Sequence, residues 1–387
     1  MNTRRPHPFP HTAIRLLPAL VLTVATVLSA AAATAPAAGS GSIYDKPYIT
    51  GSGGGIAVGG YIDMEFEMPE NGTSTFDQHR LIPFLTGHVS DRVTVSTEIE
   101  FEHGGNPDNG GEIKLEYAVL DFRFRESLQF RGGIVLSPLG SFNLLHDSPL
   151  NDLTARPVVT RQLMPSTLSE AGMGFFGSTA PGDESELDYQ VYLVNGFDEG
   201  IIDDSGRLRI RGGRGSQKAD NNDDKAIVGR LGFSPRLGAT LGASVHTGKY
   251  DDAGDLRLTI AALDAKVTLG AVELQGEAAL ASADIDRDVN PTTAESQRGA
   301  YGQVNWHVLH DKLMDGSVVT LVGRADWMDY DTDTDGDSET GWTVGVNFRP
   351  TEETVFKLDY NWTWNTPADG EKGDAEGRLF FSFASYF

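Results

Sequence analysis

Cysteine is absent from this 387-residue chain, so it forms no disulfide and holds no thiolate-bound metal. Positive charge is also scarce, because 31 Lys and Arg residues stand against 55 Asp and Glu residues. The net charge of −24 excludes nucleic-acid binding through a basic patch. After residue 40 no run of 18 consecutive apolar residues occurs, so no later segment is predicted to cross a bilayer as a helix.

The first 37 residues have the pattern of a secretory signal peptide. An apolar run over residues 16–28 follows three positive charges, Arg4, Arg5 and Arg15. Small residues come next, with candidate cleavage sites at 31–33 and 35–37. The alternative is a single membrane-anchor helix, but the run decays into alanine and no charged stop follows it. We therefore predict a signal peptide over 1–37 and a flexible glycine-containing segment over 38–55.

Alternation of apolar and polar residues dominates residues 56–387 and is typical of β-strands. About sixteen such strands can be counted, and short turns alternate along the chain with long polar loops. A secreted soluble β protein has no reason to alternate its loop lengths in this way. The pattern predicts an all-β, transmembrane antiparallel barrel over 56–387 in the outer membrane of a Gram-negative-type bacterium, with outer-membrane lipids around it.

The polar strand faces are expected to line water inside the barrel. A charged side chain that faces lipid costs about 2–4 kcal/mol near the bilayer midplane. Sixteen strands leave a water-filled channel, whereas eight strands fill their interior with side chains. The residues predicted to line the lumen wall are Asp63, Glu65, Glu98, Glu100 and Arg131. The acidic faces favour cations or neutral solutes.

The segment from Pro138 to Glu170 is too long for a turn and too rich in proline for one strand or one long helix. It also carries apolar residues to bury, which makes a free-floating loop unfavourable. We predict that this third outer loop folds into the lumen and narrows the pore, with the following candidate constriction residues: Asn143, His146, Asp147, Asp152, Arg156, Arg161 and Glu170. These charges set up a transverse field or form ion pairs that hold the loop to the wall, and the two roles are compatible.

The same region resembles the matching segment of the phosphate-selective porin family. The similar stretches are GGIVLSPLGSFNLLHDSP and TARPVVTRQLMPSTLSEAGMGFFG, within residues 131–177. The resemblance implies a homotrimer of sixteen-stranded barrels whose third loop forms the constriction. It also implies passage of phosphate or other anions past lumen arginines. Candidate anion-binding residues lie in the fourth outer loop, with a solvated loop that balances nearby acids as the alternative: Arg207, Arg209 and Arg211.

The last strand places aromatic residues on one face and ends on Phe387. This arrangement resembles the signal through which outer-membrane barrels engage the barrel assembly machinery. We therefore expect that machinery to be a partner.

Signals for an enzyme or a metal site are weak. The chain lacks GxSxG, HExxH and P-loop motifs. Asp331, Asp333 and Asp335 begin a calcium-type loop, but its twelfth position is Trp342 rather than glutamate. We predict no catalytic residue, no metal and no cofactor. The predicted function is passive diffusion of ions and small hydrophilic solutes, and the alternative is a barrel-anchored surface-binding or adhesion protein without an open pore.

Overall fold

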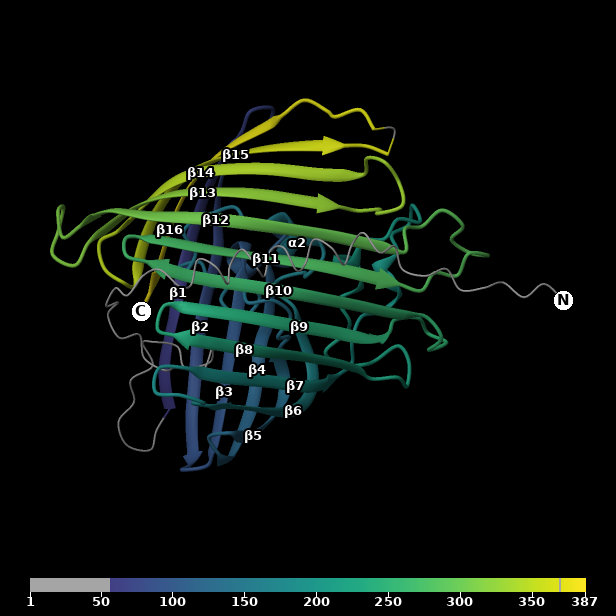
Figure 1. The fold of residues 1–387 in the computed structure, drawn as a ribbon, viewed down its shortest axis with the longest axis horizontal. Coiled ribbons are helices and arrows are strands. Elements are labelled where there is room, and N and C mark those ends of the chain that lie inside the picture. The colour runs from purple at the N-terminus through teal and green to yellow at the C-terminus, as the bar shows by residue number, and fades with distance from the viewer. Residues whose placement is uncertain (1–55, 369) are drawn as a thin grey trace. The chain divides into compact units, whose positions relative to one another are not determined.

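The computed structural model describes residues 56–368 and 370–387, so the predicted signal peptide and the segment 38–55 lie outside the described residues. Sixteen antiparallel strands form a closed barrel in which each strand pairs with its neighbours in sequence and β1 pairs with β16. Figure 1 shows these strands side by side in chain order. The predicted fold class, strand count and inward-folded third outer loop are confirmed.

The strands have the following bounds. The first eight are β1 (Ile56–Pro69), β2 (Thr75–Ser90), β3 (Val93–Glu102), β4 (Glu112–Arg125), β5 (Leu128–Leu136), β6 (Ser169–Thr179), β7 (Glu186–Val194) and β8 (Ala226–Arg236). The last eight are β9 (Ala239–Lys249), β10 (Arg257–Leu269), β11 (Val272–Ala283), β12 (Ser296–His310), β13 (Val318–Asp329), β14 (Ser338–Arg349), β15 (Thr354–Thr366) and β16 (Glu376–Tyr386).

Each strand presents apolar side chains outward and alternate residues to the interior, as its period of two requires. On β7, Val191 and Leu193 are 48% and 51% exposed, whereas Tyr192 and Val194 are each 1% exposed. An apolar outer surface suits hydrocarbon, and the closed ladder leaves no unpaired edge in it. From residue 56 onward, Asp369 aside, no helix is long and apolar enough to cross a membrane.

Two β-bulges turn consecutive side chains toward the lumen. The register between β3 and β4 shifts between Glu98 and Ile99, and both Glu116 and Tyr117 are buried as a result. The register between β1 and β2 shifts between Asp63 and Glu65. A bulge adds an extra residue to one strand and re-aims the side chains beside it. The simple inward–outward alternation therefore fails at these two places.

Two long outer loops fill part of the barrel interior. The third outer loop, residues 137–168, contains the helix α2 (Val158–Gln162), and the fourth, residues 195–225, contains η4 (Glu199–Ile201) and η5 (Ile210–Gly213). Their apolar side chains pack against β10, β11, β12 and β13 in one buried cluster, which includes Val159, Leu163, Met164, Ile201, Leu208, Ile210, Ile260, Ala281 and Met328. Both loops are thus folded elements with their own core.

Phe387 closes the seam of the barrel. Its N–H donates to the Gly60 carbonyl at 2.9 Å, and the Gly60 N–H donates to the Phe387 carbonyl at 3.2 Å. A side chain at Gly60 would begin 2.4 Å from the Ile82 carbonyl oxygen and 2.7 Å from the Phe387 ring, so glycine is required by this close approach.

Candidate pore constriction

The third outer loop begins with a turn fixed to β9 and β11. The Gly140 N–H donates to the Ser244 hydroxyl at 2.9 Å. The Ser141 hydroxyl and the Phe142 N–H both donate to Glu277 Oε1, each at 2.6 Å. Gly140 has a φ of +74°, a conformation that glycine adopts without a steric penalty. The loop is therefore turned inward at its start by contacts with β9 and β11.

The middle of the loop follows the wall formed by β12, β14, β15 and β16. Asp152 accepts hydrogen bonds from Asn305 at 2.7 Å and from Asn347 at 2.9 Å, and it pairs with Arg349 at 3.3 Å. Two further wall residues hold Thr154, whose hydroxyl lies 2.9 Å from Asp359 Oδ1 and 2.8 Å from the Ser382 hydroxyl. Asp152 thus acts as an anchor to the wall.

The same loop also reaches the strands on either side of the barrel seam. The Ser148 hydroxyl donates to Asp63 at 2.5 Å, and Lys357 Nζ donates to the Ser148 carbonyl at 2.8 Å. Asp147 accepts from the Tyr386 hydroxyl at 2.7 Å. His146 Nε2 forms an ion pair with Glu116 on β4. These contacts carry the loop across the lumen rather than along one side of it.

The two ends of the loop are joined to each other. Asn143 Nδ2 donates to the carbonyls of Ser137 and Leu168, at 2.8 and 3.0 Å, and its Oδ1 accepts from the Leu168 N–H at 2.8 Å. Glu170, the second residue after this junction, has Oε1 2.9 Å from His246 Nε2 on β9. Asn143 and Glu170 are buried and position the loop.

Arg156 differs from the other predicted constriction residues. Within the part of the chain that the structure describes, its guanidinium forms no ion pair, although it lies within electrostatic range of Arg80, Glu100 and Glu116 on the opposite wall. Arg161 is exposed and pairs with Glu339 at 3.4 Å. Among the described residues of the third outer loop, Arg156 is therefore the cation whose charge no carboxylate compensates by direct contact.

On the wall opposite Arg156, the acidic side chains are paired with basic ones that the strand sequence does not reveal. Glu100 lies 2.8 Å from Arg80 and 2.9 Å from Lys114. Glu102 lies 3.0 Å from Arg80 and 3.2 Å from Lys114. Glu98 is buried on the same strand. The prediction of an acidic lumen face overlooked these partners, because β2 and β4 supply the cations and only strand pairing brings them to β3.

The remaining predicted wall residues are also paired. Arg131 forms two bonds with Asp121, at 2.7 and 2.5 Å, and its guanidinium lies 4.3 Å from the centroid of the Phe176 ring. Asp63 and Glu65 contact one imidazole, which belongs to His79 on β2. Each of these side chains faces the interior.

The arginines of the fourth outer loop do not share one binding face. Arg207 is exposed and pairs with Asp203 at 3.5 Å. Arg209 stacks on the Tyr330 ring at 4.8 Å. Only Arg211 reaches the third loop, where its guanidinium donates to the Ser166 carbonyl at 2.8 Å. The alternation of these arginines in the sequence predicts a shared face, but each of them contacts a different partner.

Arg211 nevertheless joins a positive cluster above the third loop. Arg214 lies beside it and donates to the Thr167 carbonyl at 3.2 Å. Partial burial lowers the pKa of Arg211 to about 10, and the positive charges of Arg214, Arg156 and Arg161 contribute to this lowering. The cluster brings together cations of the third and fourth outer loops.

Several residues that build the site were not singled out from the sequence: Arg80, Lys114, Glu116, Glu277, Lys357 and Asp359. Glu277 and Asp359 had a usable signal, because each is a charged residue at an inward-facing position of a strand. Arg80 had the same signal, because it alternates with Ile82 and Phe84 on the buried face of β2. The calcium-type loop is a turn in which Asp331 accepts from the Asp333 N–H at 3.1 Å and from the Thr334 hydroxyl at 2.7 Å.

Comparisons with known proteins support the fold. No protein-family model matches this chain. An uncharacterized protein of Aquifex aeolicus is 33% identical over 217 residues, which is 54% of this chain and 47% of that protein. The chain thus spans about half the length of the curated relative that it matches.

Solved structures are similar over most of the barrel. The anion-selective porin from Comamonas acidovorans has a TM-score of 0.57 at 10% identity, over 87% of this chain and 100% of that one. The outer membrane channel DcaP of Acinetobacter baumannii has a TM-score of 0.56 at 11% identity, over 88% and 99%. OmpT of Vibrio cholerae has a TM-score of 0.56 at 10% identity, over 88% and 100%. At these identities the likeness shows the fold alone: this chain forms a closed sixteen-stranded antiparallel barrel, like the barrels of these outer-membrane proteins.

Proposed function

We propose that this protein is an outer-membrane porin for passive diffusion of small hydrophilic solutes, with a narrow constriction that favours anions. The observation that carries the proposal is Arg156, an uncompensated guanidinium on a loop held across the lumen. A fixed positive charge in a narrow pore lowers the energy of an anion and raises that of a cation. Phosphate is one candidate solute, since planar guanidinium groups bind its oxygens bidentately.

The pathway is expected to be narrow. On the wall facing the third loop, Arg80 is 2% exposed and Glu100 is not exposed at all. A wide aqueous channel would leave such groups in contact with water. We therefore expect a single-channel conductance below that of general diffusion porins. The same close packing favours a second candidate, a barrel-anchored surface-binding protein without an open pore.

The proposal includes assembly as a homotrimer and insertion through the barrel assembly machinery. One of the similar structures is described as a trimer form of OmpT from Vibrio cholerae, and a barrel of the same fold is suited to the same arrangement. Phe387, which bonds to Gly60 at the seam, is the residue through which we propose recognition by the assembly machinery. The proposal assigns no enzymatic activity.

Planar-bilayer conductance of the purified, refolded protein tests the proposal. The expected record has small steps in groups of three, a reversal potential in a KCl gradient that indicates anion preference, and a decrease in current when phosphate is added. Cation preference would refute the role given to Arg156. A well-folded barrel without conductance would refute the channel and favour the surface-binding candidate.

A further inference from the structure

Two carboxylates and an imidazole meet where β1 and β2 leave regular register. His79 Nδ1 lies 2.8 Å from Asp63 Oδ2 and 2.9 Å from Glu65 Oε1. One donor atom from each of these residues lies within 4.8 Å of the other two. The bulge explains the meeting, because it brings His79 to the same side of the sheet as its neighbour Arg80.

The carboxylate of Asp63 is buried in the barrel wall, and one of its two oxygens can still accept a bond. Its side chain is 1% exposed, and Oδ2 accepts from the Ser148 hydroxyl at 2.5 Å. Oδ1 is buried and has no hydrogen-bond partner among the described residues. Gln78 fixes the bulge by donating to the carbonyls of Asp63 and Arg80, both at 3.1 Å. A buried carboxylate oxygen without a partner is costly, and this oxygen can still accept a bond from a cation.

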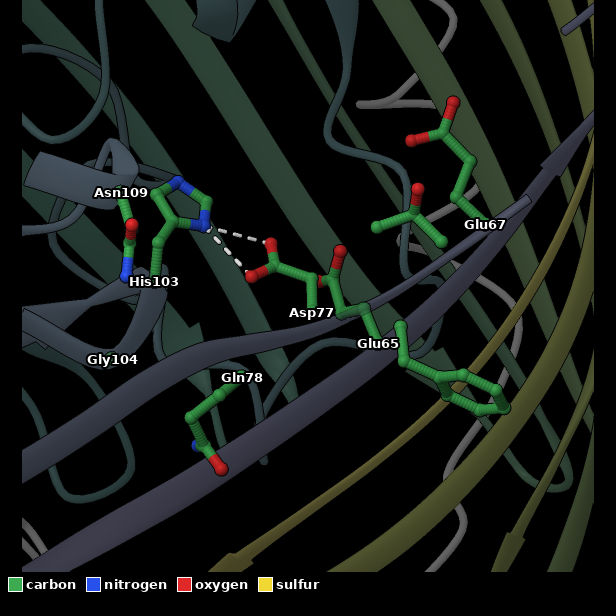
Figure 2. Close-up of a pocket in the computed structure, with 9 residues that line it drawn as sticks. Glu65, Glu67, Asp77, Gln78, His103, Gly104 and Asn109 are labelled. Carbon is green, nitrogen blue, oxygen red and sulfur yellow. Dashed lines mark hydrogen bonds and ion pairs between the residues drawn. The ribbon is translucent and has the colours of Figure 1, made fainter. Parts of the chain in front are cut away.

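A cavity of about 470 Å³ borders this cluster, and Glu65 lines it. Figure 2 shows Asp77 and His103 in the same cavity, with His103 Nδ1 directed at the Asp77 carboxylate, 2.8 Å away. The rings of His79 and His103 have centroids 5.9 Å apart. The cavity gives a solvated ion a path to Glu65, and it adds a second imidazole and a further carboxylate near the first three ligands.

We propose that His79 Nδ1 and the carboxylates of Asp63 and Glu65 bind a divalent transition-metal ion. Imidazole nitrogen with carboxylate oxygen suits zinc, nickel or copper, whereas calcium and magnesium prefer oxygen alone. Tetrahedral zinc, with bonds of about 2.1 Å, separates its ligand atoms by about 3.4 Å, so the present spacings need to open only slightly. The ion replaces the proton on His79 Nδ1, which is released to solvent.

Zinc titration of the refolded full-length barrel in detergent, followed by calorimetry, tests this site without reference to conductance. We expect saturable binding that calcium chloride at the same concentration does not reproduce. His79→Gln and Asp63→Asn are expected to abolish this binding. Ser148→Ala, which removes a hydrogen bond to a ligand, is expected to weaken it about tenfold. A channel that fails to conduct leaves this test unaffected.

His310→Gln is the matched control. His307 and His310 also have ring centroids 5.9 Å apart, but within the described chain neither forms an ion pair with a carboxylate. Zinc affinity is expected to stay unchanged in this variant. Glu65→Gln, at a side chain that is 20% exposed, keeps the test decisive if the buried variants fail to fold. Wild-type protein that binds no zinc, equal binding of calcium, or unchanged affinity in Glu65→Gln would each overturn the proposal.

Discussion

Replacing Arg156 with alanine is expected to shift the protein toward cations. A unit charge about 5 Å from a permeating ion contributes about 0.8 kcal/mol even at the dielectric constant of water. That energy changes the local concentration of an ion about fourfold, in opposite directions for the two signs of charge. The ratio of anion to cation permeability should therefore fall about 16-fold, and by more if the effective dielectric constant in the constriction is lower.

The measurement is the reversal potential of reconstituted channels in a KCl gradient. Arg156→Lys is the matched variant, because it keeps the charge and should keep most of the anion preference. Arg207→Ala removes an equal charge from an exposed position that already pairs with Asp203, and it should have little effect. The difference between the Arg156 variants should decrease near 1 M salt, where the screening length is about 3 Å.

An unchanged permeability ratio in Arg156→Ala would refute this reasoning, provided that the variant still conducts. A change of equal size in Arg207→Ala would also refute it, because it would place the selective field in the fourth outer loop. If the Arg156 side chain narrows the path, conductance should also rise in Arg156→Ala, whatever the permeability ratio.

Further predictions concern the loop, the seam and one exposed turn. Glu277→Gln replaces the carboxyl that accepts from two donors with a weaker amide acceptor and should lower the unfolding free energy by about 2 kcal/mol, as measured by urea denaturation. The open-channel current of this variant should also be noisier. Gly60→Val places a side chain against a backbone carbonyl and should reduce the yield of folded barrel on heat-modifiability gels, whereas an equal yield would contradict the tight seam. The Ser205 hydroxyl lowers the pKa of Asp203, so the turn that they form should be stable above the carboxyl's ordinary titration range. That stability should be lost as pH falls through the lowered pKa, and faster amide exchange at Gly206 would report the loss.

The strand pattern was readable from the sequence because its physical cause is local. Lipid outside and water inside impose an alternation of two on every strand, as on β7, where each outward residue is apolar. The prolines and apolar residues of the third outer loop likewise predicted a folded excursion. These inferences need only the chemistry of neighbouring residues.

The charge at the constriction was not readable, because it depends on which strands become neighbours. Glu100 reads as an acidic wall residue until Arg80 and Lys114 are placed beside it. Asp152 and Arg156 lie four residues apart in one loop, yet the first is neutralised by Arg349 and the second has no such partner within the described chain. Their positions in the sequence do not show which of the two charges finds a partner.

The sequence by itself determined the barrel, its strand count and the inward loop, because hydrophobic periodicity and turn chemistry act over a few residues. Only the tertiary structure decided the electrostatics, since ion pairs such as Arg230 with Asp264 join residues far apart in sequence. It also decided the proposed metal site, because the bulge that turns His79 toward Asp63 and Glu65 breaks the very alternation from which strand faces are predicted.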